Sequence, residues 1–205
     1  DTKKHILKNL EYHQKAKTLN DEDIKELLRN PCDNGTMLFM IDNLRKIDIT
    51  PFIEDIKYFL SGDYNDMIQT YLLLVLVDKK YQGEVTINKN KVTMECVPYE
   101  LDAPFENHYH KEFLNLLNDL SFNPSVYKTA CEIFNQYVLV LYPMNIFDDE
   151  ATLNAVSIIC LACKYLNEES MIEEYCKKYD FKEDIVINLM EEIEYMINTF
   201  LKVEL

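Results

Sequence analysis

The chain of 205 residues has only 3 glycines and no tryptophan. Glycine supplies the positive φ angles of tight turns and the close backbone approach of phosphate-binding loops. Its scarcity therefore argues against a β-sandwich, a nucleotide-binding fold or a phosphate-cradling loop, and it favours helices. The GxSxG, HExxH, P-loop and GxGxxG motifs are also missing, and no serine has a histidine nearby in the sequence. We find no catalytic constellation and expect that the protein is not an enzyme.

Acidic residues outnumber basic ones, with 36 Asp and Glu against 21 Lys and Arg, so the formal net charge is −15. This charge disfavours nucleic acid and anionic membranes as direct partners, and it fits either a basic partner surface or a solvated acidic surface. No signal peptide or membrane-spanning run is visible. Cys131, Cys160 and Cys163 lie inside apolar helical patterns, which is typical of reduced thiols. We therefore expect an intracellular protein of the cytoplasm or nucleus.

The most apolar helical segment is 148–166, with the sequence DDEATLNAVSIICLACKYL. Asp148 or Asp149 can cap its first turn, and almost no polar face follows. A helix that is apolar nearly all round belongs inside a domain, surrounded by other helices. The acids of its first turn and Lys164 in its last turn argue against a membrane span. Lys164 is the unusual residue, because a lysine at the end of a buried helix needs a carboxylate, a helix C-terminus or a partner protein.

The remaining pattern predicts a mainly all-α protein with a boundary at about 97–107. In the N-terminal region, 1–106, we expect helices at 3–18, at 21–29 after an Asn20 or Asp21 cap, from a Thr36 cap, from a Thr50 cap, and at 64–81. Alternation of β-branched and polar residues over 84–97 predicts one short β-hairpin, the only strand signal in the chain. The C-terminal domain, 107–205, is predicted to hold five helices, at 107–120, 125–141, 149–166, 169–179 and 182–201.

Two short motifs raise the question of metal or redox chemistry. Cys160 and Cys163 form a CxxC inside an apolar helix, where packing of the core explains them better than zinc binding or disulfide exchange. His108 and His110 form an HxH that Glu106 and Glu112 could complete, but nothing in the sequence specifies such a site, and we expect solvent-exposed imidazoles. No metal, cofactor or small-molecule substrate is therefore predicted.

Several segments of the C-terminal half match, in order, the helices of the cyclin box. LNAVSIICLACKY (153–165) resembles the third cyclin helix, in which a leucine begins an apolar run that ends in Ala-Ser-Lys-Tyr/Phe, and Leu153 falls on that leucine. MEEIEYMINTF (190–200) resembles the fifth helix, and TACEIFNQYV (129–138) is similar to the second. The resemblance covers about 107–205 and implies a five-helix cyclin-box-like domain. The first 106 residues resemble no family that we recognise.

The resemblance implies a cell-cycle regulatory subunit that binds and activates a cyclin-dependent protein kinase. In cyclins, the lysine and glutamate carried here by Lys164 and Glu191 pair at the kinase interface, and Tyr165 and Glu168 would flank them. A lysine and a glutamate at neighbouring helix ends can form a preorganised, charge-assisted clamp. Such a clamp would help to hold the kinase C-helix inward, where its glutamate meets the lysine that orients ATP.

Four positions depart from the cyclin pattern. Cyclins bridge an Arg of the first helix to an Asp of the second, and these positions look like Lys111 and Asn135 here. The apolar substrate-docking patch of mitotic cyclins would map near 110–114, where His110 and Glu112 alter its character, so we do not predict that docking mode. The departures keep open an alternative function, a helical adaptor or scaffold in transcription or protein assembly without a kinase partner. A metal enzyme that uses the HxH or CxxC is the third hypothesis.

Overall fold

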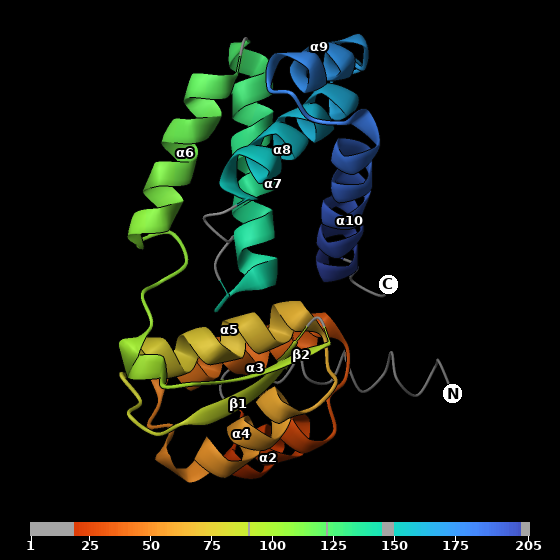
Figure 1. Cartoon of the computed structure of the whole chain (residues 1–205). Coiled ribbons are helices and arrows are strands. Elements are labelled where there is room, and N and C mark those ends of the chain that lie inside the picture. Colours follow the sequence, from red (N-terminus) through yellow and green to blue (C-terminus); the bar gives the residue numbers. More distant parts are fainter. Residues whose placement is uncertain (1–18, 90, 122, 145–149, 202–205) are drawn as a thin grey trace, which may run out of the picture. The chain divides into compact units, whose positions relative to one another are not determined.

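A computed structural model describes residues 19–89, 91–121, 123–144 and 150–201 (Figure 1). Within these residues the chain forms nine α-helices, two short 3-10 helices and one two-stranded antiparallel hairpin, so the prediction of a mainly helical protein is confirmed. The fold divides into two compact units, of which the first ends at Leu101 and the second begins at Asp102. This division lies within the boundary segment expected at about 97–107, and five residues before the start of the domain range 107–205.

The first unit contains every strand among the described residues. Its elements are α2 (Asp21–Arg29), α3 (Asn34–Lys46), η1 (Thr50–Phe52), α4 (Ile53–Ser61), α5 (Asp66–Asp78), β1 (Val85–Lys89), β2 (Val92–Cys96) and η2 (Pro98–Glu100). The hairpin predicted at 84–97 is therefore present. The helix predicted over 3–18 lies outside the described residues.

Side-chain caps mark the start of several helices in this unit, but the capping residue is not always the predicted one. Asn20 and Asp23 form a reciprocal capping box at α2, as its sequence suggests. At α3 the cap is Asp33 rather than Thr36, because the Asp33 carboxylate accepts from both the backbone N–H and the hydroxyl of Thr36, at 3.0 and 2.8 Å. Thr50 does not cap α4 but begins the 3-10 turn η1, and α4 follows from Ile53 without a side-chain cap.

The core of the first unit is built around α5 and the hairpin. Most residues of α5 are buried, and its side chains meet α3, α4 and β1. The hairpin pairs Val85 with Cys96 and Lys89 with Val92, and β1 packs on α4 and α5. Alternate residues of β1 face inward, so Val85, Ile87 and Lys89 are all buried. The third member of this row is a lysine, which is unusual for a core position.

The described residues of the second unit form five helices. These helices are α6 (His108–Leu120), α7 (Pro124–Leu141), α8 (Ala151–Tyr165), α9 (Ser170–Lys178) and α10 (Glu183–Leu201). Helix α8 contacts each of the other four, and every residue from Asn154 to Cys163 is buried (Figure 1). The prediction of an apolar helix surrounded by others is confirmed, although Leu153 is only half-buried. None of the described helices has the length and apolar character needed to cross a membrane.

Some details of the second unit differ from the sequence-based expectation. The expected caps Asp148 and Asp149 lie outside the described residues, and Glu150, at the N-cap position, makes no side-chain capping bond. On α10 the buried residues are Val186, Met190, Ile193 and Ile197, whereas the neighbouring Ile185 is 45% exposed. On α7 the buried residues are Val126, Ala130, Ile133, Phe134, Tyr137 and Val140. Where a helix has more than one apolar face, the neighbouring helices determine which face is buried.

Candidate protein-binding surface

The lysine at the end of α8 forms an ion pair with α10. Lys164 lies in the last turn of α8, and its Nζ is 2.6 Å from Oε2 of Glu194. The side chain of Lys164 is 40% exposed and that of Glu194 is 23% exposed. The buried part of α8 thus ends in a cation that a neighbouring helix holds at the surface.

The partner of Lys164 is Glu194 and not Glu191, the residue suggested by the cyclin pattern. Three residues of an α-helix turn the side-chain direction by about 300°, so the two glutamates lie roughly 60° apart around α10. The buried stripe that includes Met190 and Ile193 faces the core, and Glu194 is closer to it than Glu191 is. Glu194 is therefore within reach of α8, while Glu191 is exposed on the same helix.

Tyr165 lies beside this ion pair and is 46% exposed. Partial burial, the negative charge of Glu194 and a hydrogen bond to the Glu194 carboxylate together raise the pKa of the Tyr165 hydroxyl. The neutral phenol can donate to that carboxylate, so Glu194 serves both Lys164 and Tyr165. One carboxylate on α10 thereby orients the last two side chains of α8.

Glu168 follows the end of α8 in a left-handed turn. Asn167 has φ of 58°, and the backbone N–H of Glu168 donates to the carbonyl of Cys163 at 2.8 Å. One carboxylate oxygen of Glu168, Oε2, is buried without a hydrogen-bond partner in the protein. Of the four predicted interface residues, Lys164, Tyr165 and Glu168 therefore lie together at the C-terminal end of α8, and Glu191 lies on α10.

The CxxC cysteines are free and fully buried in α8. Burial is the main cause that raises the pKa of the Cys163 thiol to about 11, and burial also raises the pKa of Cys160. Protonated thiols in an apolar interior are poor nucleophiles and poor metal ligands, which agrees with packing of the core. In the part of the chain that the structure describes, no group of three His, Cys, Asp or Glu side chains is arranged to hold a metal ion.

The two histidines of the HxH have different surroundings. His108 is exposed and forms an ion pair with Glu112, 2.9 Å apart, if its imidazole is protonated. His110 is only 8% exposed, so the expectation of a solvent-exposed imidazole is wrong for this residue. It precedes the buried Phe113 by three positions, which places both on the inner face of α6.

His110 also makes the inner polar contact between α6 and α7. Its Nε2 is 2.9 Å from Oδ1 of Asn135, and its ring stacks on Phe134 with a centroid distance of 5.2 Å. Lys111, the expected partner of Asn135, is exposed. The inner polar pair is therefore His110 and Asn135, because the helical phase of α6 turns position 110 inward and position 111 outward.

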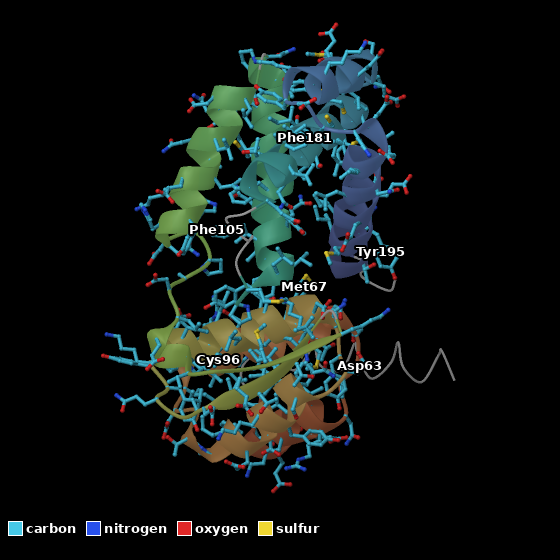
Figure 2. All side chains as sticks on the ribbon, in the orientation of Figure 1. Asp63, Met67, Cys96, Phe105, Phe181 and Tyr195 are labelled. Atoms are coloured by element: carbon cyan, nitrogen blue, oxygen red, sulfur yellow. The ribbon has the colours of Figure 1, made fainter. Side chains whose placement is uncertain are left out.

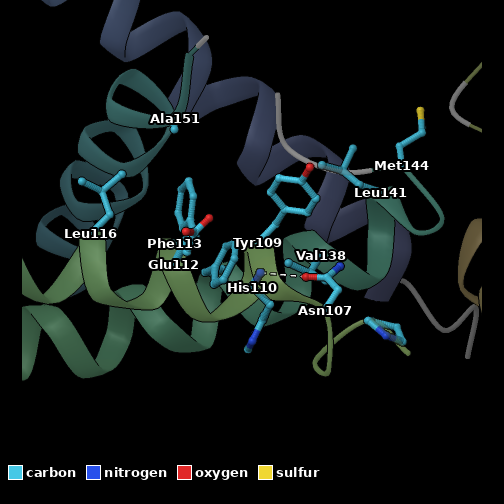
Figure 3. A pocket seen from close by; sticks show the side chains of 12 residues that line it. Asn107, Tyr109, His110, Glu112, Phe113, Leu116, Val138, Leu141, Met144 and Ala151 are labelled. Atoms are coloured by element: carbon cyan, nitrogen blue, oxygen red, sulfur yellow. Dashed lines mark hydrogen bonds between the residues drawn. The ribbon is translucent and has the colours of Figure 1, made fainter. Parts of the chain in front are cut away.

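An apolar pocket of about 130 Å³ lies beside His110 (Figure 3). Figure 3 also shows the cap of α6, in which the His110 backbone N–H donates to Oδ1 of Asn107 at 2.7 Å. Sequence reasoning missed this pocket because it treated His110 as exposed. The pocket is lined by Pro104, Asn107, Tyr109, His110, Glu112, Phe113, Leu116, Phe134, Val138, Leu141, Met144 and Ala151.

Exposed aromatic side chains occur in two regions of the second unit. Phe105 and Tyr109, near the pocket, are 43% and 46% exposed, and Tyr195 on α10 is 71% exposed. Figure 2 labels Phe105 and Tyr195. Tyrosine is one of the residue types enriched among the residues that carry most of the binding energy at protein interfaces, so Tyr109 and Tyr195 are candidate contact residues.

Comparison with models of known protein families, with curated proteins and with solved structures finds no match for this chain.

Proposed function

We propose that the second unit is a cyclin-like regulatory module that binds a cyclin-dependent protein kinase and favours its active state. The observation that carries the proposal is the position of Lys164. This lysine ends a helix that is buried over ten consecutive residues, and Glu194 holds its ammonium at the surface. The cyclin-like sequence pattern around Lys164 adds to this support.

The geometry suits capture of a partner backbone. An ammonium has three donors, and Glu194 takes one of them, so two remain for carbonyl oxygens of a partner. Because Glu194 already restricts the Lys164 side chain, less conformational entropy is lost on binding. Tyr165 beside it adds exposed aromatic surface. Glu191, exposed on α10, can accept from backbone N–H groups of the same partner.

Glu168 is the third predicted interface residue at this end of α8, where its backbone N–H donates to the carbonyl of Cys163. A partner helix docked against α8 and α10 would be stabilised in one position, which shifts the population of a kinase toward the state that needs its C-helix inward.

A helical adaptor without a kinase partner is the second candidate function. The observation that favours it is the uncharged contact between His110 and Asn135, where the cyclin pattern has an Arg–Asp bridge. An adaptor would use the same exposed side chains to bind a different protein. The two functions differ only in the identity of the partner, so one experiment separates them.

The test is retention of proteins from a cell extract on the immobilised chain, identified by mass spectrometry. We expect the wild type to retain a stoichiometric amount of a cyclin-dependent kinase. In Lys164→Glu the retained amount should fall at least roughly tenfold, because the reversed charge removes the contact of the ammonium and repels the partner groups that accepted from it. Lys177→Glu is the matched control: Lys177 also pairs with a glutamate, Glu173 at 2.5 Å, but lies on α9 and is 73% exposed.

Each outcome of this test has a defined meaning. Kinase retention that survives in Lys164→Glu would overturn the role of Lys164. Other partners without a kinase, lost in Lys164→Glu and kept in Lys177→Glu, would establish the adaptor function. A circular dichroism spectrum and a melting curve of each variant would show that the fold is intact.

A further inference from the structure

The first unit carries a lysine inside its core, at the end of the hairpin. Lys89 is the last residue of β1 and is only 2% exposed. Val85 and Ile87, the two other inward-facing residues of the strand, are each 1% exposed. Lysine is almost never fully buried in proteins unless it is paired. The strand that attaches the hairpin to the helices thus ends in an ionisable group where an apolar one would be expected.

Two polar groups of α5 act on Lys89. Its Nζ donates to the hydroxyl of Thr70, and the carboxylate of Asp66 is the charged group that acts on it. On α4 the buried carboxylate, Asp55, is paired with Arg29 at 2.5 Å. On β2 the residues opposite the inward-facing row of β1 are Val92, Met94 and Cys96, of which Val92 is 46% exposed and only Cys96 can ionise.

Burial determines which form of the amine the docked hairpin prefers. Burial lowers the pKa of Lys89 to about 7, and the charge of Asp66 offsets only part of this effect. Because burial raises the pKa of the Cys96 thiol to about 11, this thiol stays protonated where Lys89 titrates and does not compete with it. An isolated two-stranded hairpin is marginally stable in water, so β1 and β2 depend on docking against α4 and α5.

We propose that the β1–β2 hairpin is a proton-sensitive latch, which docks on α4 and α5 with Lys89 neutral and is released more often when Lys89 is protonated. In the released state the ammonium is hydrated, and the apolar residues beneath Val85 and Ile87 are uncovered. The inference concerns the first unit alone and stands independently of the proposed kinase binding.

The direction and size of the effect follow from proton linkage. Between pH of about 7 and 10.5 the released hairpin binds more protons than the docked one. The opening constant, which is the equilibrium ratio of released to docked hairpin, therefore falls as pH rises. From pH 6.5 to pH 8.5 the opening constant is expected to fall roughly 25-fold. Below about pH 6.5 both states are protonated, and the effect reaches its limit.

Hydrogen–deuterium exchange of the full chain at pH 6.5 and pH 8.5 tests the latch. After correction for intrinsic exchange rates, the protection of β1 and β2 amides should rise roughly 25-fold at the higher pH. In Lys89→Met, which keeps the length and apolar stem of the side chain, protection should change less than about threefold. The amides of α3 provide the internal reference, because the latch predicts that they are more protected than the hairpin amides at both pH values.

Three results would overturn the latch. Hairpin protection in the wild type that changes less than threefold would show that proton binding and opening are not linked. An equal change in Lys89→Met would assign the pH dependence to another group. Equal protection of the hairpin and α3 amides would mean that the whole unit unfolds together, without release of the hairpin alone.

Discussion

Helices α5 and α8 are the most deeply embedded helices of their respective units, and each is associated with one lysine in a different way. Lys89 enters the core beside α5 and is 2% exposed, with a hydroxyl as its hydrogen-bond partner. Lys164 extends from the end of α8 to a carboxylate and keeps 40% of its side chain exposed. The first arrangement costs stability when the amine is charged, whereas the second leaves the charge available to a partner.

The difference lies in where the compensating groups are, and not in the helices themselves. Burial lowers the pKa of Lys89 despite the presence of Asp66. Glu194 faces Lys164 at the edge of the protein, where water still solvates both groups. A lysine near a buried helix is therefore a candidate for binding only when its ammonium reaches the surface. Substitutions in the two units can test this contrast.

Truncation of a buried leucine in each helix tests whether both helices are equally essential to their units. Leu161→Ala in α8 and Leu72→Ala in α5 each remove a side chain that is 0% exposed. Each should lower the free energy of unfolding by about 2–5 kcal/mol, through lost transfer energy and the cavity that remains. Urea denaturation followed by circular dichroism measures this change. A loss below about 1 kcal/mol in one variant would show that the corresponding helix is less important to its core.

Removal of the buried amine tests the cost assigned to Lys89. The wild-type free energy of unfolding should rise by about 2 kcal/mol from pH 7 to pH 9, because the unfolded chain binds more protons in this window. Lys89→Met should be more stable than the wild type at pH 7 and should lack this rise. Thermal or urea unfolding at several pH values would measure both. An unchanged pH slope in Lys89→Met would contradict the assignment.

Loss of the partner of His110 tests the inner contact of α6 and α7. Asn135→Leu leaves Nε2 of the buried imidazole without its hydrogen bond and should cost about 1–3 kcal/mol. His108→Gln, on the exposed side of the same helix, is the control and should stay within about 0.5 kcal/mol of the wild type. Equal effects of the two substitutions would mean that His110 gains nothing from Asn135.

The smallest predicted effect distinguishes the roles of Glu194 and Glu191 on α10. Glu194→Gln removes the charge that helps to raise the pKa of Tyr165, so that pKa should fall, whereas Glu191→Gln should leave it unchanged. Both variants should lose less than about 1 kcal/mol of stability, because the ion pair is partly exposed. NMR titration with tyrosine labelled at Cζ would follow Tyr165 directly. A fall in both variants would show that Glu191 also acts on Tyr165.

The sequence was most informative where one residue type dominates a segment. The apolar run of α8 predicted a helix surrounded by others, and the alternation over 84–97 predicted the hairpin. Alternation also puts position 89 in the same row as Val85 and Ile87, but a lysine is not expected at a core position. The burial of Lys89 is set by α5, which supplies Thr70 and Asp66 from a distant part of the chain.

Sequence was less informative where a helix has more than one apolar face or where a polar residue is buried. On α10 the packing partners select Val186 for the core and leave Ile185 exposed. The partner of Lys164 depends on a rotation of about 60° around α10, which a motif cannot specify. The burial of His110 depends on Asn135, 25 residues further along the chain, which satisfies its imidazole.

The most direct test of the proposed function is binding of a purified cyclin-dependent kinase to the chain, measured by calorimetry for the wild type, Lys164→Glu and Lys177→Glu. We expect binding by the wild type and by Lys177→Glu, and at least a roughly tenfold weaker affinity for Lys164→Glu. Equal affinities of the three proteins would contradict the role given to Lys164, and absence of binding to the wild type would contradict kinase regulation by that kinase.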